Sequence, residues 1–202
     1  ILYYHPQSNF SRKIRILLAE KNLDYELKSI DLKNKPAEFL KISPIGRVPV
    51  FVEEDDTVIW DSTLIAEYLD ETYPEPNFYP THPQTKRECR KWEELADNLG
   101  DNVINLWILN LTNNLDPTYY RTKLETSINN LLPVFDRQLA KYKYLLGDER
   151  WTAADVAALC SFGYYNFRLN EDWLLQYDNL KNWFNRLHER ESVRSTVPTP
   201  LN

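Results

Sequence analysis

Apolar and polar positions in the first third of the chain follow two different periods. Apolar residues recur at every second position in 25–30, which is typical of a strand, and at helical spacing in 12–22 and 64–71. The pattern predicts, in order, strand 2–4, helix 12–22, strand 25–30, helix 36–42, strands 50–52 and 57–60, and helix 64–71. Strands and helices that alternate in this way favour a small mixed sheet covered by helices.

The rest of the chain shows only the helical period. A proline-dense stretch, 75–83, comes first and favours neither a helix nor a central strand. Beyond it, apolar residues recur three and four positions apart over 92–106, 124–135 and 180–187. We therefore predict an α/β domain over 1–74, a linker over 75–83 and an all-helical domain over 84–202.

One helix of the second domain carries its own start signal. Thr152 and Asp155 are spaced as a capping box in which Asp replaces the usual Glu, and Trp151 can pack against Val156. Such a cap typically contributes about 1 kcal/mol of stability. We expect its role to be structural.

Composition and charge exclude several functions. The 24 Lys and Arg against 30 Asp and Glu give a net charge of −6 without a basic run, so we expect no nucleic-acid partner. No apolar stretch approaches the roughly 20 residues of a membrane span, and no signal peptide is visible. The three histidines stand far apart, so we expect no metal site. Cys89 and Cys160 lack Cys-x-x-Cys spacing and predict buried or semi-buried thiols in a reducing compartment, the cytoplasm.

One candidate site lies around a proline at the start of a predicted strand. In Ile45-Gly46-Arg47-Val48-Pro49-Val50-Phe51, Gly46 permits a turn, and Pro49 cannot donate to a sheet ladder. About 5% of X-Pro bonds are cis, and we predict that the Val48–Pro49 bond is one of them. The backbone N–H and C=O of Val48 would then point outward and pair with an extended peptide.

The next predicted helix begins with a candidate anion site. Asp61 and Ser62 are both good N-caps, but Leu64 and Ile65 stand where a capping box needs Glu or Gln. We therefore expect first-turn amides without an acidic partner, ready for a carboxylate at the positive end of the helix dipole. The Asp61 carboxylate would hold an ammonium group. The alternative is an ordinary capped surface helix after a hairpin.

These segments resemble the cytosolic glutathione transferase family, whose pattern is a proline-containing strand, then Glu, Gln or Asp before Ser, then an apolar helix ending in Tyr-Leu. The stretch 5–14 is similar to the Ser-x-x-Ser-Arg entry of the serine classes (phi, tau and theta types), and 147–155 resembles the family's capping signature. The resemblance implies an N-terminal thioredoxin-like domain followed by a C-terminal helical bundle domain. The class stays open, and we expect a bacterial member.

The resemblance also implies the chemistry. Adding glutathione to an electrophile needs the thiolate, and a hydroxyl that donates to the sulfur near a helix N-terminus favours that anion. The first serine of the motif, Ser8, carries this role in the serine classes. Tyr4, near the position used by the tyrosine classes, and Ser11, which we predict to be the N-cap of the first helix, are the alternatives. Phe10 stands where cysteine classes keep their thiol, which argues against thiol transfer and dehydroascorbate reduction.

The remaining ligand contacts follow from the same resemblance. The glutathione-binding residues that we expect are Lys35, Arg47, Val48, Pro49, Asp61 and Ser62. Lys35 and Arg47 match residues near the glycine carboxylate, although both also fit a solvated surface charge. For the electrophile we expect an apolar wall between the domains, formed by Phe10 on the first loop and Trp107 on the long helix. Aromatic residues at such spacing are also common in a core.

The leading hypothesis is a cytoplasmic glutathione transferase that conjugates small hydrophobic electrophiles in detoxification. Glutathione is then the co-substrate, no metal takes part, and the resemblance implies a homodimer. Two alternatives stay open, because a fold does not fix a function. One is a non-catalytic transferase-like binding or assembly module, and the other is a glutathione-dependent isomerase or lyase. The Ser-Ser-Cys entry of maleylacetoacetate isomerases is missing from this chain.

Overall fold

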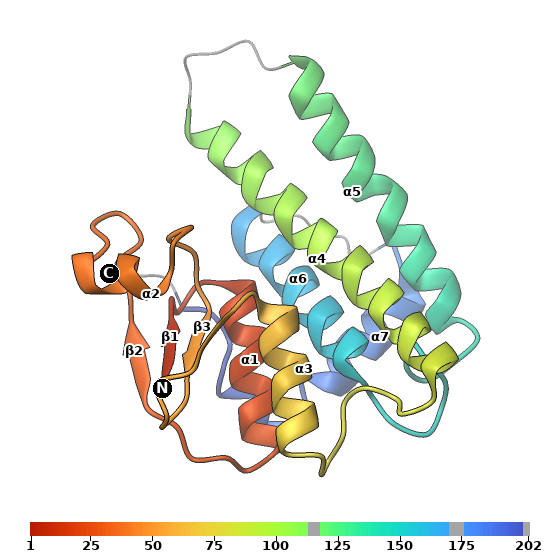
Figure 1. The fold of residues 1–202 in the computed structure, drawn as a ribbon. Helices are drawn as coiled ribbons and strands as arrows, with labels where there is room; N and C mark the ends of the chain where they lie inside the picture. The colour runs from red at the N-terminus through yellow and green to blue at the C-terminus, as the bar shows by residue number, and fades with distance from the viewer. Residues whose placement is uncertain (113–117, 170–175, 200–202) are drawn as a thin grey trace. The chain divides into compact units, whose positions relative to one another are not determined.

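The computed structural model describes residues 1–112, 118–169 and 176–199 (Figure 1). The chain divides into two compact units. The first contains residues 1–79 and the C-terminal residues from 191 onward, and the second contains residues 80–190. The sequence pattern assigned 191–202 to the helical domain, whereas the described part of this stretch packs with the first unit.

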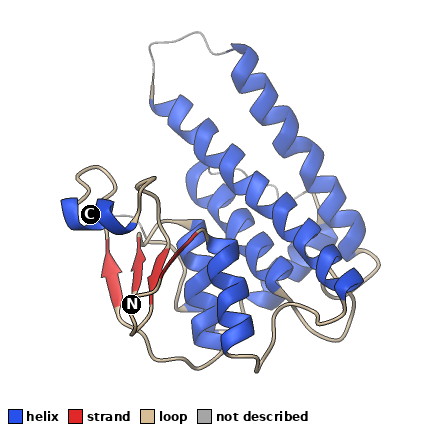
Figure 2. Ribbon diagram, viewed as in Figure 1, coloured by secondary structure: helices blue, strands red, loops and turns tan. Residues whose placement is uncertain are grey.

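The first unit is a four-stranded mixed sheet with helices, as the sequence pattern predicts (Figure 2). The strand order is β2-β1-β3-β4, with β1 and β2 parallel and the other two pairs antiparallel. Its elements are β1 (Leu2–Tyr4), α1 (Asn9–Glu20), β2 (Leu27–Ser29), α2 (Ala37–Ile42), β3 (Val50–Val52), β4 (Val58–Trp60), α3 (Ser62–Thr72) and the short α8 (Glu191–Arg194).

Alternation along the strands gives this sheet two apolar faces. On one face Tyr3 and Val50 pack against Phe39 of α2, and the Tyr3 and Phe39 rings are 6.0 Å apart. Phe51 follows Val50 and so points the other way, where its ring lies 6.3 Å from that of Tyr68 in α3. Helix α1 runs beside α3 (Figure 1). Helices α1 and α3 therefore pack together within the unit that contains the sheet.

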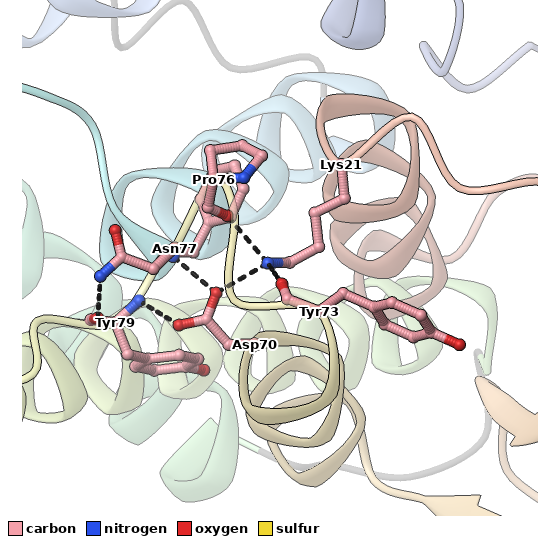
Figure 3. A network of polar contacts seen from close by, with 7 residues as sticks. Lys21, Asp70, Tyr73, Pro76, Asn77 and Tyr79 are labelled. Carbon is pink, nitrogen blue, oxygen red and sulfur yellow. Dashed lines mark hydrogen bonds and ion pairs between the residues drawn. The ribbon is translucent and has the colours of Figure 1, made fainter.

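A buried lysine joins the C-terminal ends of α1 and α3 (Figure 3). The Lys21 ammonium donates to Asp70 Oδ1 at 2.9 Å and to the carbonyl oxygens of Tyr73 and Pro76 at 2.6 and 2.8 Å. The Lys21 side chain is fully buried, so these three acceptors replace the water that the charge loses. Asp70 also accepts from the backbone amides of Phe78 and Tyr79. The network fixes residues 73–79 against both helices.

The second unit is a bundle of four described helices, which confirms the predicted all-helical part. They are α4 (Pro83–Leu111), α5 (Thr118–Leu139), α6 (Ala153–Leu169) and α7 (Asp178–Leu187). Its core contains four rings in edge contact, with centroid distances of 5.2, 5.2 and 6.3 Å along the series Trp92, Phe135, Phe162 and Trp183. Within the described ranges, no helix has the length and apolarity that a membrane span needs.

Asp155 caps α6 with its carboxylate in a fully buried position. Its Oδ2 accepts from the Thr152 amide at 2.9 Å and the Thr152 hydroxyl at 3.1 Å. Its Oδ1 accepts from the Leu145 amide and the Trp183 indole, both at 3.0 Å. Burial raises the pKa of Asp155 above its ordinary value, and these four donors act in the opposite direction. The predicted capping box is thus half correct, since the Thr152 hydroxyl donates to Asp155 and does not cap a backbone amide.

Candidate functional site

Ser8 is the N-cap of α1. Its backbone is extended (φ −82°, ψ 123°), and its Oγ accepts a hydrogen bond from the Ser11 amide at 3.1 Å. The Ser8 amide donates to the His5 carbonyl at 3.0 Å and so closes the turn before the helix. A hydroxyl oxygen that accepts an amide still carries its own proton. Ser8 can therefore donate to a sulfur atom at the positive end of α1.

The two alternative hydroxyl groups lie in different settings. Our prediction that Ser11 caps the helix was wrong, because Ser8 takes that position and α1 begins at Asn9. Ser11 is fully buried in the first turn, and its Oγ accepts from the His5 amide at 3.4 Å. The Tyr4 ring lies under the Arg15 guanidinium, 5.2 Å from the ring centroid. Both side chains thus have local packing partners.

The turn before β3 presents an unpaired piece of backbone. The Val48–Pro49 bond is cis, which confirms the prediction. Among the residues that the structure describes, neither the N–H nor the C=O of Val48 has a hydrogen-bonding partner. The Val48 side chain is buried in the cluster with Phe39 and Val50. The side chain anchors the residue while its backbone can pair with an extended ligand.

Ser43, which the sequence analysis missed, fixes the shape of that turn. The Ser43 hydroxyl donates to the Arg47 carbonyl at 2.9 Å and accepts from the Arg47 amide at 3.1 Å. Gly46 has φ +61°, and its amide donates to the Ser43 carbonyl at 2.8 Å. A serine between a helix end and a Pro-x-Gly turn is a known turn signal and could have identified this residue.

One cationic side chain lies at the same turn. A Cβ atom built on Gly46 would lie 3.2 Å from Lys35 Nζ, so the Lys35 side chain crosses directly over this glycine. Arg47 follows Gly46 in the chain, and both cationic residues are exposed. The structure therefore places Lys35 at the turn that carries Arg47 and Val48, although Lys35 stands apart from them in the sequence.

Asp61 caps α3 with one oxygen. Its Oδ1 accepts from the Thr63 amide at 2.9 Å and the Leu64 amide at 3.2 Å. Our prediction that the first-turn amides lack an acidic partner was therefore wrong, because Asp61 itself is that partner. Asp61 has φ +78°, a strained backbone for a residue with a side chain, and such residues cluster at functional sites. Both bonds use Oδ1, so within the described residues Oδ2 can still take an ammonium group.

Two further side chains complete the start of α3. Ser62, the first helical residue, is 4% exposed. Lys13 of α1 is 1% exposed, and its ammonium donates to Thr63 Oγ1 at 3.2 Å. Lys13 was not among the predicted site residues. Its spacing of three and four from the buried Ile16 and Leu17 is the signal that could have placed it on the inner face of α1.

The candidate electrophile-binding residues lie in separate units. Phe10 belongs to the first turn of α1 and not to the preceding loop, where we expected it. Trp107 lies on α4, as expected, and the Arg168 guanidinium stacks 4.1 Å from the centroid of its ring. Each side chain is half-buried.

Both cysteines are buried in this fold, Cys89 on α4 and Cys160 on α6. Burial raises the pKa of the Cys89 thiol to about 12, so it stays protonated at neutral pH. In the part of the chain that the structure describes, no three His, Cys, Asp or Glu side chains form a group that could hold a metal ion.

Comparisons with known proteins match both units. A family model described as "Glutathione S-transferase, N-terminal domain" matches residues 2–77, and one described as "Glutathione S-transferase, C-terminal domain" matches residues 116–191. The chain is 28% identical to glutathione S-transferase GstB of Escherichia coli K12, over 99% of this chain and 98% of that protein. It is 32% identical to a probable maleylacetoacetate isomerase of Caenorhabditis elegans, over 78% of this chain and 74% of that protein.

A solved structure agrees with these matches. The crystal structure of a glutathione S-transferase from Methylobacillus flagellatus KT with GSH bound superimposes with a TM-score of 0.93. The two chains are 28% identical, and the match covers 98% of each. At this similarity the whole described architecture is shared, from the mixed sheet to the helical bundle.

Proposed function

Because this chain belongs to the cytosolic glutathione S-transferase family and is a transferase, we propose that it adds the glutathione thiolate to small hydrophobic electrophiles. The observation that carries the proposal is the Ser8 hydroxyl at the start of α1. Its oxygen is held by the Ser11 amide, while its proton is available to the sulfur. A free thiol has a pKa of about 8.5, so this donor and the helix dipole would increase the thiolate fraction at neutral pH.

The γ-glutamyl end of glutathione fits the start of α3. The ammonium group would pair with Asp61 Oδ2, and the α-carboxylate would accept hydrogen bonds from Ser62 at the positive end of the helix. The strained Asp61 backbone sets this carboxylate beside the helix start. One short segment thus offers a partner for the ammonium group and a partner for the carboxylate of an amino acid.

The rest of the tripeptide fits the turn before β3. The unpaired N–H and C=O of Val48, next to Pro49, would pair with the cysteinyl backbone of glutathione, as strand-like ligands do at sheet edges. Lys35 and Arg47 would lie near the glycine carboxylate. We assign them an electrostatic role because both are exposed.

The proposal includes a setting for the enzyme. Reduced glutathione is a cytosolic thiol, and two buried cysteines suit that compartment. Conjugation of hydrophobic electrophiles there would serve detoxification. We further propose that Phe10 and Trp107 contact the electrophile, because an apolar ring offers the low-polarity surface that such a substrate needs.

The test is an assay of the whole protein with glutathione and a small panel of electrophiles, including chlorodinitrobenzene. We expect retention on immobilised glutathione, release by free glutathione, and turnover of at least one electrophile. Retention without turnover of any electrophile would favour the non-catalytic binding module. A protein that neither binds glutathione nor turns over an electrophile would overturn the proposed function.

A further inference from the structure

The C-terminal segment of the described chain returns to the first unit and contacts α1 close to Ser8. The Arg12 guanidinium donates from Nη2 to the Val193 carbonyl at 3.1 Å and from Nε to Thr196 Oγ1 at 3.4 Å. Arg12 is 1% exposed and Thr196 is 4% exposed, so these bonds lie in a buried environment. Arg12 stands one helical turn after Ser8, and its amide donates to the Ser8 carbonyl at 2.9 Å.

A second contact reaches the other side of Ser8. The Gln7 side-chain amide donates from Nε2 to the Thr199 carbonyl at 3.1 Å, across 192 residues of sequence. Gln7 is 9% exposed and directly precedes Ser8. Residues 193–199 therefore hold the chain immediately before the capping serine and one turn after it.

The turn that carries Ser8 also has local bonds. They run from the Gln7 amide to His5 Nδ1 at 3.2 Å, from the Ser8 amide to the His5 carbonyl, and from the His5 amide to Ser11 Oγ at 3.4 Å. All three lie within residues 5–11, whereas the bonds of Gln7 and Arg12 join this turn to a distant segment of the same unit. A donor that stabilises a forming charge must be held to within about 0.5 Å, and groups packed behind it supply that restraint.

We propose that Gln7 and Arg12 are positioning residues for Ser8, and that the segment 193–199 is a working part of the thiolate site. The inference rests on the proposed function and adds to it the residues that orient the Ser8 hydroxyl toward the sulfur. Without these contacts, the turn can shift while glutathione stays bound at Asp61, Ser62 and Val48. The hydrogen bond from Ser8 to the sulfur weakens first, and the pKa of the bound thiol rises toward that of free glutathione.

The experiment measures the pKa of the glutathione thiol on the protein, by ultraviolet titration of the thiolate, together with glutathione affinity and kcat. Gln7→Leu removes the amide donor at similar size, and Thr196→Val removes the hydroxyl acceptor of Arg12. We expect each to raise the thiol pKa by about one unit and to lower kcat severalfold near neutral pH, with glutathione affinity within about twofold. Thr196→Ser keeps the hydroxyl and should retain the wild-type thiol pKa.

Ser192→Ala is the matched structural control. Ser192 donates to Glu20 at the opposite end of α1, so this variant weakens the docking of the same segment far from Ser8. We expect a lower melting temperature and an unchanged thiol pKa. Gln7→Leu leaves the buried Arg12 contacts in place, so it tests the proposal even if Thr196→Val does not fold.

The outcomes separate this inference from the proposed function. If Gln7→Leu, and Thr196→Val where it folds, keep the wild-type thiol pKa and lose only thermal stability, the segment is structural and the inference is overturned. If the wild-type protein itself does not bind glutathione or lower its thiol pKa, the proposed function fails before any variant is compared.

Discussion

At the scale of single residues, the Ser8 hydroxyl combines two tasks that are usually assigned to different groups. As an acceptor it satisfies the Ser11 amide, one of the donors that every helix start leaves without an intrahelical partner. As a donor it keeps its own proton, and the bond from the Ser11 amide limits the directions in which that proton can point. A substitution of Ser8 therefore changes both the helix cap and the proposed stabilisation of the thiolate.

The first prediction separates these effects. Ser8→Ala should lower kcat at neutral pH by about 10- to 100-fold and shift the pH–rate profile upward, because the thiolate loses its hydrogen bond. The lost cap should cost only about 1 kcal/mol of stability. Glutathione affinity should stay close to that of the wild type. Steady-state kinetics across pH, with thermal denaturation alongside, test this prediction.

Tyr4→Phe is the control for this prediction. It keeps the ring that packs under Arg15 and removes only the hydroxyl. Loss of activity in Tyr4→Phe with an active Ser8→Ala would show that the chain uses a tyrosine, contrary to the serine-type motif. If both variants stay active, the buried Ser11 hydroxyl or the backbone amides must hold the thiolate.

The second prediction concerns the charge of Asp61. Asp61→Asn keeps an oxygen that can cap α3, since Asn and Asp are similar caps, but it removes the negative charge. We expect glutathione to bind about 10- to 150-fold more weakly, because a charge-assisted bond contributes about 1.5–3 kcal/mol. Calorimetry with glutaryl-cysteinylglycine, which lacks the amine, supplies the comparison. Equal losses for both ligands would contradict a pairing of Asp61 with the ammonium.

At the scale of elements, Asp61 and Asp155 show two uses of one residue type at a helix start. Asp61 is exposed, and only one of its carboxylate oxygens accepts the hydrogen bonds of the cap. Asp155 is buried, and both of its oxygens accept hydrogen bonds, from four donors in three different segments. The first can therefore serve a ligand, whereas the second joins α6 to the rest of its unit.

The third prediction follows from the complete use of Asp155. Asp155→Asn replaces one acceptor oxygen with an NH₂ group that faces donors, so at least one buried donor loses its partner. We expect a loss of about 1–3 kcal/mol in the free energy of unfolding. Chemical denaturation measures it, and Asp148→Asn, at an exposed loop position, is the comparison. Equal stability of the two variants would contradict a structural role of the cap.

The elements themselves could be predicted from the sequence because their cause is local. The period of the apolar residues identified the strands and helices of residues 1–79 in the correct order, but not α8, the helix of the first unit that follows the helical domain in the chain. The start of α1 was placed too late because Ser8 and Ser11 are both good caps by type. The choice between them depends on the burial of Ser11.

The parts of the candidate site that were not predicted have different causes. Ser43 and Arg47 are close in sequence, and turn chemistry could have linked them. The bonds from Lys13 to Thr63 and from Gln7 to Thr199 span 50 and 192 residues, and no periodicity reports such contacts. The acceptor on Thr199 is also a backbone carbonyl, which carries no signature in the sequence.

At the scale of the whole molecule, the exposed apolar residues bear on assembly. Trp60 and Leu64, just before and after the cap of α3, are 45% and 50% exposed. Large apolar side chains that lie together on a surface are typical of protein contacts. We propose that a second copy of this chain covers them, with the first domain of one chain against the long helix of the other.

The fourth prediction is a two-fold homodimer at micromolar concentration. Analytical ultracentrifugation should give about twice the mass of one chain, which is 24.0 kDa. Leu64→Glu places a charge in the proposed contact and should shift the equilibrium toward monomer. Leu27→Glu, on the edge strand β2, is the matched control. A wild-type monomer in this experiment would contradict the proposal.

The return of the C-terminal segment to the first unit has a consequence for synthesis on the ribosome. Domains generally fold as units while the chain emerges from its N-terminus. Here the acceptors of the Arg12 guanidinium belong to Val193 and Thr196, which leave the exit tunnel after the whole of the second unit. The environment of Ser8 therefore stays incomplete on the ribosome until residues 80–190 have been translated. A chain released before Val193 would lack the groups that we propose to position this serine, so the thiolate site would be assembled only after the second unit has been made.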